Sequence, residues 1–258
     1  MTPAFWAKTV GDDQPGISVH DHMVNVGLVA LCLAHVGEEL LRHFEIELPQ
    51  VGALAALHDL GKISPGFQRK CAAWLKANHL SDIARRCAWD RDMESDHGQV
   101  THAAVQTFLV EQGANRRAAK YLSAILGGHH GRLHWPSDRG FQPTKAISEQ
   151  HSGIDWAKAR NDAALAICDT FHADLARFTI DADSPALWWL AGLTSVADWI
   201  GSDERFFSPE HGTAATDTAE NAKKAIQTIG LVPPKIKTGL SFHDLFHDPQ
   251  VPSVPFTP

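Results

Sequence analysis

Apolar residues recur at helical spacing along most of this 258-residue chain, whereas continuous strand-like alternation is scarce. The first pattern follows Ser18, a residue suited to cap a helix, and its stripe runs through Met23, Val26, Ala30, Leu33, Gly37 and Leu40. Further helices are predicted over 49–61, 65–74, 99–111, 116–126, 154–178 and 186–202, with a weaker one over 216–228. Gly61 is expected to end the second of these helices. The pattern predicts an all-α helical bundle.

Two regions depart from the helical pattern. The segment 131–146 contains two prolines and two glycines and predicts a long loop of the kind that carries function. Six of the 14 prolines fall between Pro233 and Pro258. We therefore expect one domain over 1–230 and a proline-rich linker or tail over 231–258. Trp188, Trp189 and Trp199 lie in helical stretches and are expected in the core.

Composition excludes several classes of protein. The charge is 23 − 30 = −7, which argues against broad electrostatic attraction to nucleic acid but permits a nuclease whose strand another module delivers. The four cysteines form no CxxC pair, so they indicate buried thiols in a reducing, cytoplasmic setting. The longest apolar run, 28–34, is too short to cross a bilayer, so we expect no membrane partner. No GxxxxGK[ST] loop is present, and no ATP site is expected in this chain.

The strongest local signal is the dipeptide His58-Asp59, which Gly61 and Lys62 follow. At a helix end, His58 would supply a neutral ring nitrogen and Asp59 two oxygens able to bridge two cations. Taken alone, the dipeptide favours a surface His-Asp pair beside a glycine cap, so the metal-site interpretation depends on other residues.

Several other polar residues are predicted to face inward. His22 and Asp198 each fall on an apolar helical stripe, and burying an unpaired carboxylate costs several kcal/mol. A metal ion is one partner that would offset this cost. His129 and His130 lie between glycines that let the backbone turn tightly, and His97 shares a helical face with apolar residues.

In this order, these residues resemble the HD phosphohydrolase superfamily and, more narrowly, the HD nuclease domain of the type I CRISPR helicase-nuclease. The motifs that carry the resemblance are HDLGKISPGFQ (58–68), GGHHGR (127–132) and SVADWIGSDERFF (195–207), with FWAK (5–8) and HGQVT (97–101). They extend over residues 5–207, most of the chain. The resemblance implies the HD-domain helical bundle as the fold.

The resemblance also implies two metal ions. One would be held by His22, His58, Asp59 and Asp198, and Asp59 would bridge to a second, held by His97, His129 and His130. Nitrogen-rich sites suit Fe(II), Mn(II), Co(II) or Ni(II) better than Mg(II). Such a pair would generate a metal-bound hydroxide that attacks a phosphodiester. His20 is the alternative to His22, and His102 is the alternative to His97.

Three further residues are candidates for contact with substrate. Lys62 is a catalytic candidate beside Asp59, because it could neutralise charge developing on a phosphate, although a surface lysine is an equal interpretation. Ser202, one turn after Asp198, and Arg132 could also contact phosphate. A helix-end hydroxyl and a solvent-facing arginine are the alternatives for these two.

The resemblance implies metal-dependent cleavage of single-stranded DNA. The strand would come from a helicase domain, absent from this chain and joined in cis or present as a separate subunit, after displacement by the Cascade surveillance complex. Two other functions stay open. One is a phosphohydrolase acting on nucleotides or cyclic nucleotides, and the other is a non-catalytic, metal-stabilised domain that docks proteins.

Overall fold

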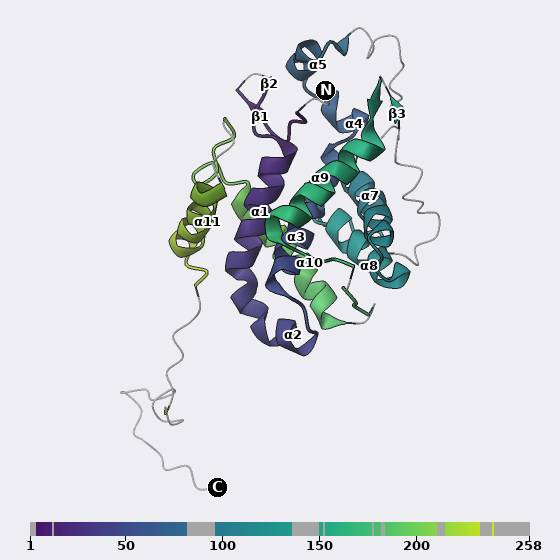
Figure 1. The fold of residues 1–258 in the computed structure, drawn as a ribbon. Helices are drawn as coiled ribbons and strands as arrows, with labels where there is room; N and C mark the ends of the chain where they lie inside the picture. The colour runs from purple at the N-terminus through teal and green to yellow at the C-terminus, as the bar shows by residue number, and fades with distance from the viewer. Residues whose placement is uncertain are drawn as a thin grey trace.

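The structure is a computed structural model, and the residues that it describes are 4–11, 13–81, 96–135, 150–151, 153–176, 178–181, 184–210, 215–232 and 239. Helices predominate among them, and the strands form two short antiparallel pairs, β1 (Thr9–Val10) with β2 (Gln14–Pro15) and β3 (Gln150–His151) with β4 (Ile154–Asp155). The predicted all-α class is therefore confirmed (Figure 1).

Helix α1 (Val19–Leu33) is the central element of the core. It begins where predicted, because the Ser18 side chain accepts a hydrogen bond from the backbone N–H of Asp21. It packs against α3 (Leu48–Ala56), α10 (Pro185–Gly201) and α11 (Ala215–Ile229). A 3₁₀ turn, η1 (Ala34–Gly37), separates it from α2 (Glu38–His43), so the stripe predicted to continue through 37–40 breaks there.

The stretch Val19–His43 is also long and apolar enough to cross a membrane by length and composition alone. However, 56% of its apolar window is buried inside the protein. Its hydropathy is explained by its position at the centre of the bundle.

The segment after α3 corrects the prediction for Gly61. Helix α3 ends at Ala56, and a second 3₁₀ turn, η2 (Leu57–Lys62), follows it directly. Gly61 therefore lies inside η2 and does not end the helix. A Cβ atom at Gly61 would overlap the carbonyl oxygen of His97 and crowd the amide nitrogen of Thr101. Glycine is required because the backbone of the next long helix passes against this turn. Ser64 then caps α4 (Pro65–Gln68), and α5 (Ala72–Ala77) follows.

Helices α7 (His97–Glu111) and α8 (Arg116–Gly127) form an antiparallel pair beside η2. Helix α9 (Trp156–Phe171) is shorter than the predicted helix over 154–178. The first two residues of the predicted helix, Ile154 and Asp155, pair in β4 instead. At the other end, His172 adopts a left-handed conformation, with φ 53°, that ends α9.

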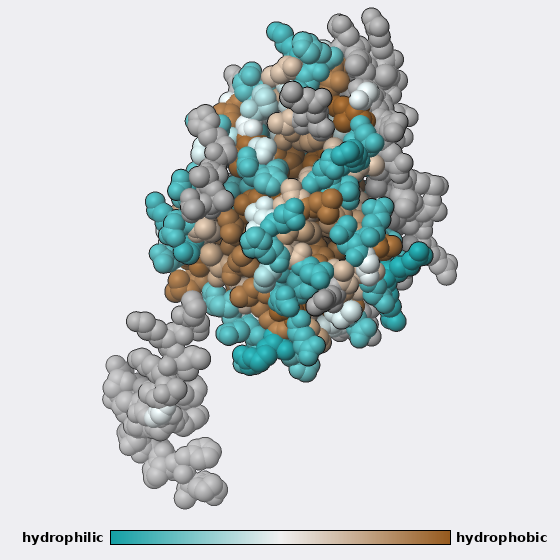
Figure 2. Space-filling view, viewed as in Figure 1, coloured by the Kyte–Doolittle hydropathy of each residue, from teal (hydrophilic) through white to brown (hydrophobic). Residues whose placement is uncertain are grey.

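Hydrophilic residues follow the outer face of α9 (Figure 2). On this helix Lys158 and Asp162 form an exposed ion pair. Trp188 and Trp199, expected in the core, are 53% and 70% exposed, so the prediction is wrong for these two. Trp189, expected there as well, is partly buried and packs against the core. Residues 136–146 of the predicted loop, and most of the predicted tail (233–238 and 240–258), lie outside the described residues. The domain boundary at 230 therefore stays a prediction.

Candidate metal centre

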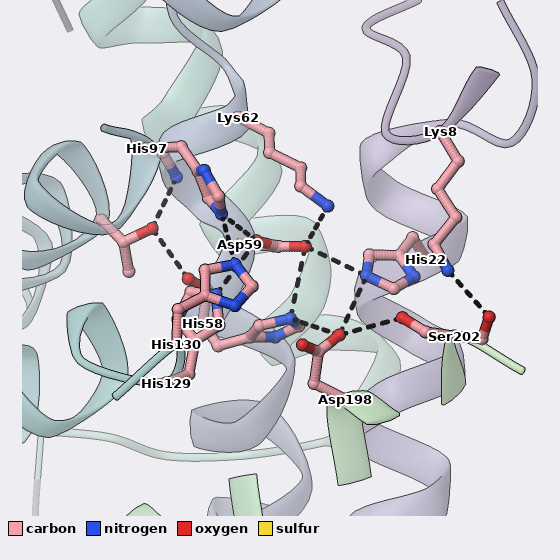
Figure 3. A network of polar contacts seen from close by, with 12 residues as sticks. Lys8, His22, His58, Asp59, Lys62, His97, His129, His130, Asp198 and Ser202 are labelled. Atoms are coloured by element: carbon pink, nitrogen blue, oxygen red, sulfur yellow. Dashed lines mark hydrogen bonds and ion pairs between the residues drawn. The ribbon is translucent and has the colours of Figure 1, made fainter. Parts of the chain in front are cut away.

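Five elements bring the predicted ligands to one point. Helix α1 supplies His22, η2 supplies His58 and Asp59, and α10 supplies Asp198, while the first residue of α7 and the turn after α8 supply the other histidines (Figure 3). Their potential ligand atoms form two groups, and the atoms of each group all lie within 4.8 Å of one another. The buried group consists of His22, His58, Asp59 and Asp198, and the open group of His97, His129 and His130. All seven residues predicted as ligands are therefore brought together.

Asp59 connects the two groups. Its Oδ2 lies 3.0 Å from Nε2 of His22 and 3.3 Å from Nε2 of His58. Its Oδ1 lies 3.2 Å from Nε2 of His97 and 3.6 Å from Nε2 of His129. Each carboxylate oxygen thus faces one group, which is the arrangement that a carboxylate bridging two ions requires.

Backbone hydrogen bonds orient two of the imidazoles. Nδ1 of His58 donates to the carbonyl oxygen of Ala55 at 2.9 Å, and Nδ1 of His129 donates to that of Leu126 at 2.7 Å. These bonds leave each Nε2 facing the centre, as in the supporting shell of metal-ligating histidines.

The atoms that face the centre have unmet hydrogen-bonding capacity. Nε2 of His22, of His58 and of His129 and Oδ1 of Asp59 are buried and make no well-formed hydrogen bond among the described residues. Their nearest polar neighbours are one another, at the 3.0–3.6 Å given above. Imidazole nitrogens and carboxylate oxygens together suit divalent transition-metal ions, so the residues fit the implied metals.

Three further contacts complete the centre. Oδ1 of Asp198 lies 3.4 Å from Nε2 of His58 and accepts a hydrogen bond from the Ser202 hydroxyl at 3.1 Å. On the open side, Nε2 of His130 lies 3.1 Å from Nε2 of His97. Two ring nitrogens approach this closely when a proton or a cation lies between them.

Charges in the centre are strongly coupled. Burial disfavours a proton on His58, but Asp59 and Asp198 outweigh this effect and raise the pKa of His58 to about 10. Burial works against ionisation of Asp59, yet Lys62 and His58 hold its pKa well below the usual range. Burial, followed by repulsion from His58, lowers the pKa of His129 to about 3. The metal-free centre therefore offers an ionised Asp59, a neutral His129 and a proton on His58 that a cation would displace.

Comparison with known proteins places this geometry in a family. The family model for the HD domain of Cas3 matches residues 6–207, most of the chain, and this range contains both ligand groups. The chain belongs to the Cas3 HD-domain family. It is also 29% identical to the CRISPR-associated endonuclease/helicase Cas3 of Thermus thermophilus, over 88% of this chain and 25% of the relative. The chain thus spans about a quarter of the length of that curated relative.

Solved structures share the fold of this Cas3 HD domain. The Thermus thermophilus Cas3 HD domain, solved in the presence of Ni²⁺, superposes with a TM-score of 0.61 at 24% identity, over 88% of this chain and 89% of that one. A chain of a CRISPR RNA-guided surveillance complex in a pre-nicking state gives a TM-score of 0.62 at 21% identity, over 87% of this chain and 28% of that one. At these identities the likeness establishes the HD-domain fold.

The alternative histidines lie elsewhere in this Cas3 HD domain. His20 is partly exposed, and its Nδ1 lies 3.5 Å from Asp21. His102 is buried against Gly127, and burial, with a smaller effect of His134, lowers its pKa to about 4. Neither belongs to a ligand group, so the structure favours His22 and His97 over these alternatives.

The three substrate candidates differ in position. Nζ of Lys62 lies 2.6 Å from Oδ2 of Asp59, and the lysine is 9% exposed. The Ser202 hydroxyl is directed at Asp198, and Arg132 is exposed just beyond the turn that carries His130. Their contacts with substrate stay predictions.

Sequence analysis missed one supporting residue of the Cas3 HD domain. The buried Thr101 hydroxyl donates to the carbonyl oxygen of His58 at 2.8 Å and accepts from the N–H of Gly61 at 2.9 Å. It thereby fastens η2 to α7. Its position one turn after His97 was visible in the sequence, but that spacing gives no indication of bonds to a turn 40 residues away.

Proposed function

We propose that this Cas3 HD domain is a metal-dependent nuclease that hydrolyses phosphodiester bonds of single-stranded DNA, using two divalent transition-metal ions. The observation that carries the proposal is the pair of ligand groups that share Asp59, with buried nitrogen and oxygen atoms that make no well-formed hydrogen bond among the described residues. Asp59 and Lys62 are its proposed catalytic residues.

The two groups would hold one ion each. His22, His58 and Asp198 would complete the first site with Asp59, and the three histidines of the open group would complete the second. We propose Fe(II), Mn(II), Co(II) or Ni(II), because five imidazoles and two carboxylates form a nitrogen-rich set that Mg(II) does not favour. When bound, such ions acidify water and neutralise charge on the oxygens of a phosphodiester.

The chain's own side chains supply position and charge. Asp59 contacts histidines of both groups and so fixes their relative position. Its carboxylate also keeps the Lys62 ammonium at the centre. An ammonium has three N–H donors, so Lys62 retains donors for a phosphate oxygen. Because His130 is exposed while His22 and His58 are buried, a polymer strand would approach from the side of His130.

The proposed strand needs a delivery partner. The net charge of −7 disfavours tight binding of free DNA by this domain. We propose that a helicase domain, in cis or as a separate subunit, feeds it a strand displaced by the Cascade complex in the cytoplasm. The name of the Thermus thermophilus relative, an endonuclease/helicase, supports this proposal, as does the likeness to a chain of a surveillance complex.

The test is cleavage of circular single-stranded DNA by metal-free protein titrated with Mn(II), Ni(II), Co(II), Fe(II) or Mg(II). We expect cleavage with the transition metals, weaker cleavage with Mg(II), and none after Asp59→Asn. Asp162→Asn, at an exposed position on α9, is the matched control and should cut like the wild type.

The other outcomes distinguish the alternative functions. Hydrolysis of cyclic or free nucleotides without cutting of DNA would favour a nucleotide phosphohydrolase. A metal that raises the melting temperature without any hydrolysis would favour a docking domain. Equal cleavage of double-stranded and single-stranded circles would contradict the proposed strand preference.

A further inference from the structure

A second lysine reaches the metal centre from the N-terminal segment. Lys8 is partly buried, and its Nζ donates to the carbonyl oxygen of Ser202 at 2.9 Å. The hydroxyl of that serine donates to Asp198. Figure 3 shows Lys62 directed at Asp59, while Lys8 reaches Ser202 beyond His22. The Lys8 ammonium therefore stands beside the buried group without contacting a ligand atom.

One buried side chain fixes the segment that carries Lys8. The Gln68 amide nitrogen donates to the carbonyl oxygens of Trp6 and Lys62, both at 2.9 Å, and its oxygen accepts from the N–H of Trp6 at 3.2 Å. The Trp6 indole returns a bond to the carbonyl oxygen of Gln68 at 3.2 Å. Gln68 thus joins the backbone two residues before Lys8 to the backbone of Lys62, so the two lysines are positioned by one common contact.

The two ammonium groups act on the same region. Burial lowers the pKa of Lys8, and repulsion from Lys62 lowers it further, while Asp198 and Asp59 oppose the shift. The Lys62 ammonium already pairs with the negative charge of the Asp59 carboxylate. The Lys8 ammonium lies near that of Lys62 although the two charges repel each other. Two ammonium groups arranged in this way suit an anion that extends across the centre.

We propose that Lys8 is a second phosphate-binding residue of this centre, which holds the backbone of the strand that is cleaved. The proposal rests on the nuclease function proposed above. Among the described residues Lys8 uses one N–H for Ser202, so two of its three donors remain for non-bridging phosphate oxygens. Contacts of this kind position a strand without reading its sequence.

The test compares Lys8→Met, which removes the charge but keeps the length, with Lys8→Arg and with the exposed control Lys158→Met. Lys8→Met should raise the KM for oligothymidylate about tenfold with little change in kcat, since a hydrogen bond to a charged group contributes about that factor. The slope of log K against log salt, from anisotropy of a labelled oligothymidylate, should become shallower by about 0.7. Lys8→Arg should retain most binding, and Lys158→Met should match the wild type.

Mn(II) affinity and melting temperature separate substrate binding from a structural role. Both should stay at wild-type values in Lys8→Met. An unchanged KM and salt slope would overturn the proposal and leave Lys8 as a partner of the Ser202 carbonyl oxygen at the end of α10. A fall in Mn(II) affinity that accounts for the change in KM would also overturn it, because Lys8 would then act through Asp198. Wild-type protein that binds oligothymidylate without cutting it would refute the nuclease function alone, and the salt slope would still test Lys8.

Discussion

The two ligand groups of the centre share Asp59 but differ in their surroundings. All four residues of the first group are buried, and long helices or η2 carry them. The second group ranges from buried His129 to exposed His130, and two of its members lie on the turn after α8. A buried ligand held by a packed helix loses little freedom when it binds an ion, whereas an exposed side chain on a turn must be ordered. The comparison predicts one tight site and one exchangeable site.

The shared residue gives the largest expected effect. Asp59→Asn removes the charge from both groups at once, so it should lower kcat for single-stranded DNA by at least about a thousandfold, as the loss of a group that several others depend on does. Binding of Mn(II), measured by titration calorimetry, should weaken at both sites. Loss of only one ion would show that Asp59 does not bridge the groups and would break the comparison.

Paired substitutions test the difference directly. His22→Gln should weaken the tighter Mn(II) site more than about 100-fold, and His130→Gln should weaken the weaker site about tenfold, since ligand and supporting residues contribute on this scale. Calorimetry that resolves two binding steps provides the measurement. Equal losses at both sites would contradict the difference in preorganisation.

The two ligand groups should also differ in how their metal affinity depends on pH. His58 has a pKa raised to about 10 in the metal-free protein, so an ion entering the buried group must displace a proton throughout the neutral range. The affinity of that group should therefore rise with pH, about 100-fold between pH 7 and 9, until the proton is lost near pH 10. His129, with a pKa lowered to about 3, is already neutral and adds no such dependence to the open group. Calorimetry in buffers of different ionisation enthalpy would count the protons released.

The contact between η2 and α7 should have a moderate effect. Thr101→Val removes both hydrogen bonds at an otherwise similar volume, leaving a buried carbonyl and N–H without partners, at a cost of about 2 kcal/mol. Thr101→Ser keeps the hydroxyl and is the matched control. Denaturant unfolding of the metal-free protein measures the loss. Valine and serine variants of equal stability would show that the contact contributes nothing.

Features of the fold that depend on neighbouring residues could be predicted from the sequence. The Ser18 cap and the all-α class follow from short-range chemistry, and the ordered motifs indicated the residues that the structure gathers at the centre. Trp199 shows the limit of a pattern taken one residue at a time. It is the neighbour of Asp198, and adjacent helical side chains point about 100° apart, so a buried Asp198 directs Trp199 outward.

The contacts that support the centre were not predictable, because they join segments far apart in the sequence. Gln68 bonds to Trp6 across 62 residues, and Lys8 bonds to Ser202 across 194. Gly61 was misassigned for the same reason, since the need for glycine arises from the backbone of α7 and not from the local turn.

Two serines on or beside α10 give the smallest and most selective test. The Ser202 hydroxyl donates to Asp198 of the buried group, whereas that of Ser195 donates to the carbonyl oxygen of His129 in the open group. Ser202→Ala should lower the affinity of the tighter site about tenfold, because a ligand loses the partner that orients it. Ser195→Ala should leave that site within about twofold, because its hydroxyl supports only the backbone of the open turn and has a second acceptor in Ala191. If both variants weaken the tighter site equally, α10 acts as one rigid support, and the two groups are not independent.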